Sequence, residues 1–247
     1  MNSPRQRLTI LTQYGILLLL AVGSAHAHIP LSPAILDDAF EDIEQAQAAA
    51  DAAAKPVKQA VAIYDFAIKA SGLMMLLNQE IQLHGMDQQN LLDEAVARAA
   101  GRGIEITWSE DHQRYFYTGG AYHRYLELMP DGLNAANSRY HLIETDFYRG
   151  DAGNREELVA RAAIESDFLH RYPEFGNAGR VAMFLGIDYR DLWRTCRAAD
   201  DFECMDRYSK LNRDHLAAVS AHYADSKTGE LARTLLQRFE AEIAEGQ

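Results

Sequence analysis

One unit of sequence recurs along the chain, and its phase constrains the fold more than any other feature. Between Phe168 and Trp193, an apolar helical pattern ends at a Tyr-Pro pair, a short turn follows, and a second helical pattern begins. The same order of features occurs upstream around Pro130 and downstream around Ala224. A proline marks a helix end because it disfavours helical backbone in the residue before it. The recurrence predicts antiparallel helical hairpins that stack one after another.

The segments that carry this unit resemble tetratricopeptide repeats. They read Phe-Leu-His-Arg-Tyr-Pro at 168–173, Leu-Gly-Ile-Asp-Tyr-Arg-Asp-Leu at 185–192 and His-Tyr-Ala-Asp-Ser at 222–226. They are most similar to the subclass found in periplasmic and outer-membrane-associated bacterial proteins. The spacing departs from the family, because Pro130 and Pro173 are 43 residues apart and Pro173 and Ala224 are 51 apart, against a usual period of about 34.

The resemblance covers about residues 121 to 243, and it implies an all-α fold of antiparallel hairpins stacked as a solenoid. Such repeats bind peptides or other proteins on a curved surface. We therefore expect a non-enzymatic scaffold that binds a protein or peptide, in the setting of cell-envelope assembly or maintenance. In the family the first helix of each hairpin lines that surface. In this register the candidate partner-binding residues are Asn137, Tyr140, Glu144, Tyr148, Arg180, Met183, Arg190 and Asp191. For Tyr140 and Met183 the alternative is a place in the core.

The N-terminus has the parts of an export signal over residues 1–27. Arg5 and Arg7 form a positive start, Ile16 to Val22 is the densest apolar stretch, and Ala25-His26-Ala27 offers small residues for cleavage. An anchoring helix is the less favoured alternative, because the apolar run is well short of the roughly 20 residues that span a bilayer. No later segment is expected to span a membrane. We expect the mature chain to be periplasmic or secreted.

The region of residues 28–103 shows helical patterns outside the resemblance. Ser32 followed by a proline is a helix start, and Pro56 either kinks that first helix or begins the next. The next helix carries apolar residues at helical spacing, which we expect to face the core. They are Val57, Val61, Tyr64 and Ile68, and the pattern continues toward Met75. A further helix is expected from about Asp87 to Ala100, ended by glycines.

Residues 104–120 break the helical pattern. Ile104, Ile106 and Trp108 alternate with polar residues, and so do Tyr115 and Tyr117, with turn material between them. This alternation predicts a small inserted β-hairpin over about 104–117. The alternative is an amphipathic helix from Glu110 onward. The predicted plan is a signal peptide (1–27), an N-terminal helical region (28–103), the hairpin insertion (104–120) and the helical repeats (121–247).

The mature part of the chain is acidic. Residues 28–247 carry 22 Lys and Arg against 36 Asp and Glu, a formal charge of −14. This balance argues against nucleic acid and anionic membranes as main partners, because both attract clustered positive charge. The sequence names neither the partner nor the oligomeric state.

The two cysteines and the absence of catalytic motifs complete the prediction. Cys196 and Cys204 make an even count in an exported chain, which favours a disulfide between the end of one helix and the start of the next. No zinc-protease, phosphate-loop or nucleophile-elbow motif is present, so no catalytic residue, cofactor or metal is assigned. The alternative function is a periplasmic enzyme or metal-binding protein, with copper at His28 after cleavage as its sharpest form.

Overall fold

The computed structural model describes residues 30–85, 87–110, 112–149 and 154–245. The elements reported below all belong to one compact unit, Leu31–Gln247. The described residues are 78% helical, with nine helices packed in consecutive pairs and one small antiparallel hairpin. The predicted all-α class with stacked hairpins and an inserted β-hairpin is therefore confirmed. The predicted signal peptide (1–27) and His28 lie outside the described residues, and the domain boundaries stay predictions.

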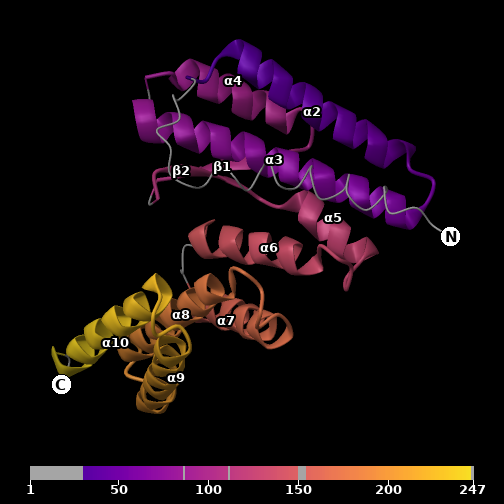
Figure 1. Ribbon diagram of the computed structural model, residues 1–247. Coiled ribbons are helices and arrows are strands. Elements are labelled where there is room, and N and C mark those ends of the chain that lie inside the picture. Colours follow the sequence, from indigo (N-terminus) through magenta and orange to yellow (C-terminus); the bar gives the residue numbers. More distant parts are fainter. Residues whose placement is uncertain (1–29, 86, 111, 150–153, 246–247) are drawn as a thin grey trace. The chain divides into compact units, whose positions relative to one another are not determined.

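The N-terminal helices are α2 (Pro33–Ala52), α3 (Pro56–His84) and α4 (Gln89–Ala100), and α2 packs against both α3 and α4 (Figure 1). Helix α2 begins as its sequence predicts, because the Ser32 hydroxyl accepts a hydrogen bond from the backbone N–H of Ile35 at 3.4 Å. Pro56 begins α3 and does not kink α2. Its fixed φ suits the first helical position, where the missing N–H has no partner to lose.

Helix α3 buries a different stripe from the expected one. Its core face is Ala60, Ile63, Phe66, Ala67, Ala70, Leu73, Leu77 and Glu80. Val57 and Val61 are instead 59% and 58% exposed, and Tyr64 and Ile68 are partly buried. The buried stripe is rich in alanine, and small side chains let α2 approach the α3 backbone closely. The prediction of an inward Val57 and Val61 is wrong for this reason.

Helix α3 also has the dimensions of a membrane span. In the part of the chain that the structure describes, it is the one helix long and apolar enough to cross a bilayer, and 44% of its apolar window is buried inside the protein. The sequence prediction overlooked this helix. Length and composition alone do not separate a span from the core helix of a soluble protein, so α3 carries no conclusion about a membrane.

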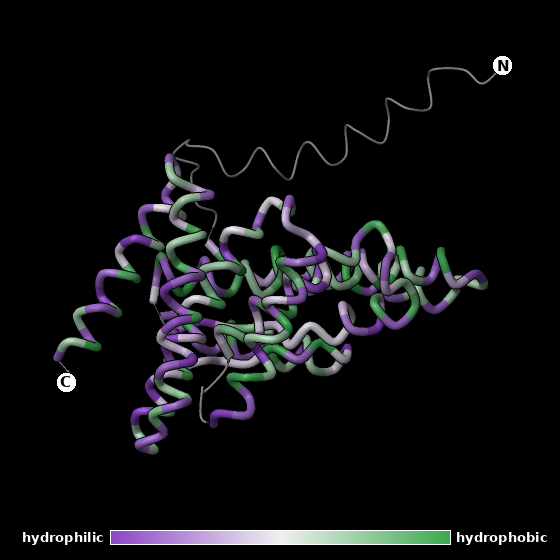
Figure 2. The backbone as a smooth tube through the Cα atoms, turned by 90° about the horizontal axis from the view of Figure 1, so that it is seen from below, coloured by the Kyte–Doolittle hydropathy of each residue, from purple (hydrophilic) through white to green (hydrophobic). Residues whose placement is uncertain are grey.

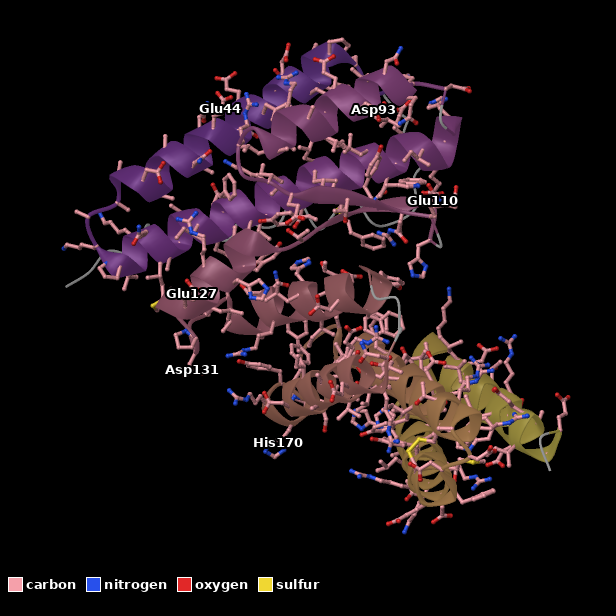
Figure 3. All side chains as sticks on the ribbon, turned by 180° about the vertical axis from the view of Figure 1, so that it is seen from behind. Glu44, Asp93, Glu110, Glu127, Asp131 and His170 are labelled. Carbon is pink, nitrogen blue, oxygen red and sulfur yellow. A yellow bond between two sulfur atoms is a disulfide. The ribbon has the colours of Figure 1, made fainter. Side chains whose placement is uncertain are left out.

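The hairpin consists of β1 (Ile106–Ser109) and β2 (Arg114–Tyr117), with Ile106 opposite Tyr117. Asn78 of α3 holds the hairpin in place. Its Nδ2 donates to the carbonyl of Tyr115 at 2.9 Å, and the N–H of Tyr115 donates to its Oδ1 at 2.7 Å. Glu110 lies at the turn that joins the strands (Figure 3). Asn78 therefore binds the free edge of β2, while the side chains of Tyr115 and Tyr117 lie on one face of the strand and that of Phe116 on the other.

Six helices follow the hairpin. They are α5 (Gly120–Leu128), α6 (Ala135–Arg149), α7 (Arg155–Arg171), α8 (Ala178–Ala198), α9 (Phe202–His222) and α10 (Lys227–Glu245). Each packs on its neighbour in sequence, and α8 also contacts both α6 and α10. Side-chain caps fix two of the starts: Asn154 accepts from the N–H of Glu157 at 2.9 Å, and Asp201 accepts from the N–H of Cys204 at 3.1 Å. The first helices of the successive hairpins, α6, α8 and α10, thus follow one another in space. We call them the outgoing helices.

The core of these hairpins lies along α8, and its last turn is cross-linked. Trp193 packs edge-on against Phe239 of α10, with ring centroids 5.3 Å apart. The tube of α10, next to the label C, alternates hydrophilic and hydrophobic segments, as expected of a helix with one buried side (Figure 2). Cys196 and Cys204 form the predicted disulfide, drawn in yellow in Figure 3, with Cα atoms 5.6 Å apart. The bridge joins α8 to α9 across their short connection.

Candidate functional site

The hairpin, α6 and α8 meet at the side chain of Tyr148, in the last turn of α6. Its ring stacks on Phe116 of β2, with centroids 5.9 Å apart, and meets His112 of the hairpin turn edge-on at 5.4 Å. Phe184 of α8 contacts the same ring edge-on at 5.6 Å. We call the residues around this ring the Tyr148 cluster, which comprises His112, Arg114, Phe116, Glu144, Tyr148, Arg180 and Phe184.

Two arginines of the Tyr148 cluster lie over aromatic rings. The guanidinium carbon of Arg114 is 5.0 Å from the ring centroid of Phe116 and 5.4 Å from that of Tyr148. That of Arg180 is 5.6 Å from Tyr148 and 5.7 Å from Phe184. A cation over an aromatic face is stabilised by about 0.5 to 1 kcal/mol at exposed sites. The rings therefore hold both positive charges in place at one point of the surface.

Glu144 compensates one of these two charges. Its Oε1 lies 2.7 Å from Nη2 of Arg180 and accepts from the Tyr140 hydroxyl at 3.3 Å. The same Nη2 donates to the hydroxyl of Tyr148 at 2.9 Å. Burial, and then the negative charge of Glu144, raise the pKa of Tyr140 well above its ordinary value. Tyr140 therefore stays protonated and donates to the carboxylate.

In contrast to Arg180, Arg114 forms no ion pair with an acid in the described parts of the chain. Its Nε is shielded from solvent and has no hydrogen-bond acceptor among the described residues. With the histidines left out, the cluster holds two positive charges and one negative charge, which leaves an excess of one positive charge. Residues 28–247 carry a formal charge of −14, so a local excess of positive charge contrasts with the rest of the chain.

A small cavity of about 30 Å³ adjoins Arg114 and Tyr148. It is lined by Ser71, Met74, Arg114, Phe116, Tyr117, Tyr122, His141, Glu144, Thr145 and Tyr148. A water molecule needs about 10 to 15 Å³ by this measure, so the cavity is large enough for a few atoms. Burial lowers the pKa of His141, which stacks on Tyr122 at 4.8 Å, so this imidazole is neutral at neutral pH.

The structure brings together four of the predicted partner-binding residues: Tyr140, Glu144, Tyr148 and Arg180. The other four lie elsewhere. Asn137 donates to the hydroxyl of Tyr64 on α3 at 2.7 Å, and Met183 is buried in the core. Arg190 pairs with Glu242 of α10 at 2.6 Å, and Asp191 accepts from Arg194 at 3.2 Å. Their role in partner binding stays a prediction.

Sequence reasoning missed the contribution of the hairpin to the cluster. His112, Arg114 and Phe116 come from a segment that was predicted only as an insertion. A signal was nevertheless present, because Tyr115, Phe116 and Tyr117 are three consecutive aromatic residues. Consecutive large apolar residues in a strand indicate that both of its faces are covered. All three are buried, which shows that β2 packs between other elements.

A second cluster of charged residues is buried between α7 and α8. Arg161 binds Asp188 through Nε at 2.6 Å and Nη2 at 2.5 Å. Both carboxyl oxygens of nearby Glu165 are buried without a hydrogen-bond partner. Burial, and then the negative charge of Asp188, raise the pKa of Glu165 to about 9. Glu165 is therefore protonated at neutral pH, and its position at the helix interface makes it a group that affects stability.

Within the described ranges, no group of three or more His, Cys, Asp or Glu side chains is placed to hold a metal ion. The sequence matches no protein-family model and no curated protein. Function is therefore inferred from the residues themselves.

Proposed function

We propose that this chain is an exported, non-enzymatic scaffold of the tetratricopeptide-repeat type that binds another protein or peptide in the cell envelope. The observation that carries the proposal is the Tyr148 cluster, where arginine and aromatic side chains from three elements gather at one place. Arginine and tyrosine are enriched among the residues that dominate protein interfaces. Arg180 is 44% exposed and His112 is exposed, so a partner has access to the cluster.

The stacking of the outgoing helices supports the binding of a protein or peptide partner on a rigid surface. Glu144 of α6 pairs with Arg180 of α8, and Arg190 of α8 pairs in turn with Glu242 of α10. These ion pairs link successive outgoing helices through side chains on their neighbouring faces. A surface that is already ordered loses less conformational entropy when it binds. The same pairs are the contacts that a peptide-binding repeat array needs to keep its helices in register.

The chemistry of the Tyr148 cluster favours binding over catalysis. Its phenol accepts a hydrogen bond from Arg180, and its carboxylate is paired. A general base needs a free acceptor within reach of a substrate proton and a pKa near the working pH. His141, the imidazole in the adjoining cavity, is partly buried and stacks on Tyr122. What the cluster offers a ligand is hydrogen-bond donors, positive charge and aromatic surface.

Site-specific photo-crosslinking in cells tests the proposal. A photoreactive amino acid replaces His112 in the full-length chain, and the matched control replaces Phe202, which is 75% exposed on α9. We expect one envelope protein to be captured from position 112 and not from position 202. The capture should be lost when Tyr148→Ala is added, with the thermal melting of each variant as the folding control. Equal capture from both positions, or none from position 112, would refute the proposal.

A further inference from the structure

Arg114 carries an unfilled hydrogen-bonding capacity at the Tyr148 cluster. Its Nε–H is shielded from water and meets no acceptor, while the guanidinium is held over the rings of Phe116 and Tyr148. A donor that is desolvated and unpaired destabilises the free protein. A ligand oxygen does not reach this shielded nitrogen, but Nη1 and Nη2 of Arg114 are not shielded and have no hydrogen-bond partner among the described residues, so they are the donors that a ligand acceptor meets.

Arg180 has donors left for the same ligand. Both of its bonds to protein atoms, to Glu144 and to Tyr148, use Nη2. Nε and Nη1 have no such bond among the described residues and are available to a second acceptor. Both guanidinium carbons lie near the ring of Tyr148, at 5.4 Å for Arg114 and 5.6 Å for Arg180. The phenol ring therefore serves as a common support for two groups of donors.

The charge of the cluster sets the charge of the ligand. Two arginines and Glu144 leave one uncompensated positive charge, which a single carboxylate neutralises. Nucleic acid fits poorly, because its phosphates require a row of cationic side chains. The overall negative charge of the chain is screened beyond about 8 Å at physiological salt. An acidic side chain that has reached the cluster therefore interacts mainly with the two arginines.

The cavity and the aromatic rings around Arg114 also select the shape of the ligand. The adjoining cavity of about 30 Å³ has room for the two oxygens of a carboxylate. The rings of Phe116, Tyr148 and Phe184 lie beside the arginines. A planar guanidinium offers parallel N–H groups that match a carboxylate, which a lysine ammonium does not. Apolar or aromatic residues next to the acid fit the rings.

We infer that the Tyr148 cluster binds one carboxylate of an acidic peptide segment, between Arg114 and Arg180. This inference rests on the proposed scaffold function and names the chemistry of its partner. Arg114 supplies its Nη groups, Arg180 supplies Nε and Nη1, and the aromatic rings contact the residues beside the acid. Glu144 stays bound to Nη2 of Arg180 and limits the site to one negative charge.

Paired peptides test the inference with the mature chain, residues 28–247. The probes are fluorescein-labelled Ala-Phe-Asp-Phe-Ala-amide and the same peptide with Asn in place of Asp. Fluorescence anisotropy gives the affinity, and the Nε–H resonances of an isotope-labelled protein report which arginines are contacted. We expect the Asp peptide to bind about tenfold more tightly than the Asn peptide, as a charge-assisted hydrogen bond implies. It should shift the Nε–H signals of Arg114 and Arg180.

Variants locate the effect. Arg114→Gln should lower the affinity for the Asp peptide by about tenfold and leave the affinity for the Asn peptide unchanged. The matched control is Arg197→Gln, because Arg197 also lies over an aromatic ring, that of Trp193 at 5.4 Å, but outside the cluster. This control should bind both peptides as the wild type does. Unchanged melting temperatures confirm that the variants are folded.

Three results would overturn the inference: equal affinity for the two peptides, no binding of the Asp peptide, or equal losses in Arg114→Gln and Arg197→Gln. The crosslinking experiment separates this failure from failure of the proposed function. If position 112 captures its partner in both wild type and Arg114→Gln, the scaffold stands and the carboxylate site is refuted. If position 112 captures nothing, the scaffold function itself fails.

Discussion

Glu165→Gln should make the protein more stable at neutral pH and weaken the pH dependence of its stability. Glu165 is 0% exposed between α7 and α8, and neither carboxyl oxygen has a hydrogen-bond partner. Burial and the charge of Asp188 raise its pKa from 4.5 to about 9. A charged carboxylate at this position is strongly disfavoured, so the folded protein keeps a proton that the unfolded chain releases.

The sign and size of the effect follow from proton linkage. Between pH 4.5 and about 9, the folded state binds more protons at this site than the unfolded state does. The contribution of Glu165 to stability is therefore full below pH 4.5 and is lost as pH rises toward 9. The slope is about 1.4 kcal/mol per pH unit. From about pH 5.5 to about pH 7.5 the loss reaches about 3 kcal/mol as an upper limit. Glutamine has nearly the same shape and does not ionise, so the variant lacks this loss.

Urea unfolding followed by circular dichroism measures the difference. Wild type and Glu165→Gln are unfolded at several pH values between about 5.5 and about 7.5 at constant ionic strength, with the m-value as a check that the transition is unchanged. The control is Glu156→Gln, an exposed carboxylate on the same helix, which should follow the wild-type curve. Parallel curves of unfolding free energy against pH for wild type and Glu165→Gln would refute the reasoning, since the ionisation of Glu165 would then make no contribution to the pH dependence.

Three further substitutions or treatments test the packing. Reduction of the Cys196–Cys204 bridge should lower the free energy of unfolding by about 2 to 3 kcal/mol, the loop-closure value for so short a loop, and an unchanged melting temperature under reductant would contradict this. Asn78→Ala should cost about 2 kcal/mol in urea unfolding, because it leaves an N–H and a C=O of β2 without partners; the exposed control Asn90→Ala should cost far less. Arg161→Met should cost about 3 to 5 kcal/mol, since Asp188 is then buried without its partner, and a loss below about 1 kcal/mol would show that the pair is dispensable.

Local signals predicted most of the element boundaries. Ser32 with Pro33 predicted the start of α2, the alternation around Trp108 predicted the hairpin, and the recurring helix ends near Pro130, Pro173 and Ala224 predicted the outgoing helices. The choice of buried face in α3 could not be predicted in this way. Its sequence has two apolar stripes, and periodicity alone gives no reason to prefer the one with Ala60 over the one with Val61. Packing against α2 decides, because the smaller side chains allow the closer approach.

The candidate site was predictable along one helix but not across elements. Tyr140, Glu144 and Tyr148 follow one another at i, i+4 and i+8, so a shared helix face follows from helical geometry. The position of their partner Arg180 depends on how α6 packs against α8. The spacing of the repeats was enough to predict that these two helices are neighbours. The place of Arg114 depends on the hairpin resting on α3 and turning its other face to α6. No local pattern encodes that pairing.

The ion pairs of the outgoing helices distinguish arginines that hold helices together from arginines that are available to a partner. The sequence alone does not make this distinction. Arg190 and Glu242 satisfy each other, so their charges hold α8 to α10 and leave little for a partner. Arg114 has a shielded donor and makes no ion pair among the described residues. A ligand carboxylate would therefore change the environment of Arg114 more than that of Arg190, whose charge is already paired. The search for a partner therefore begins at the hairpin face of α6 and not along the whole line of outgoing helices.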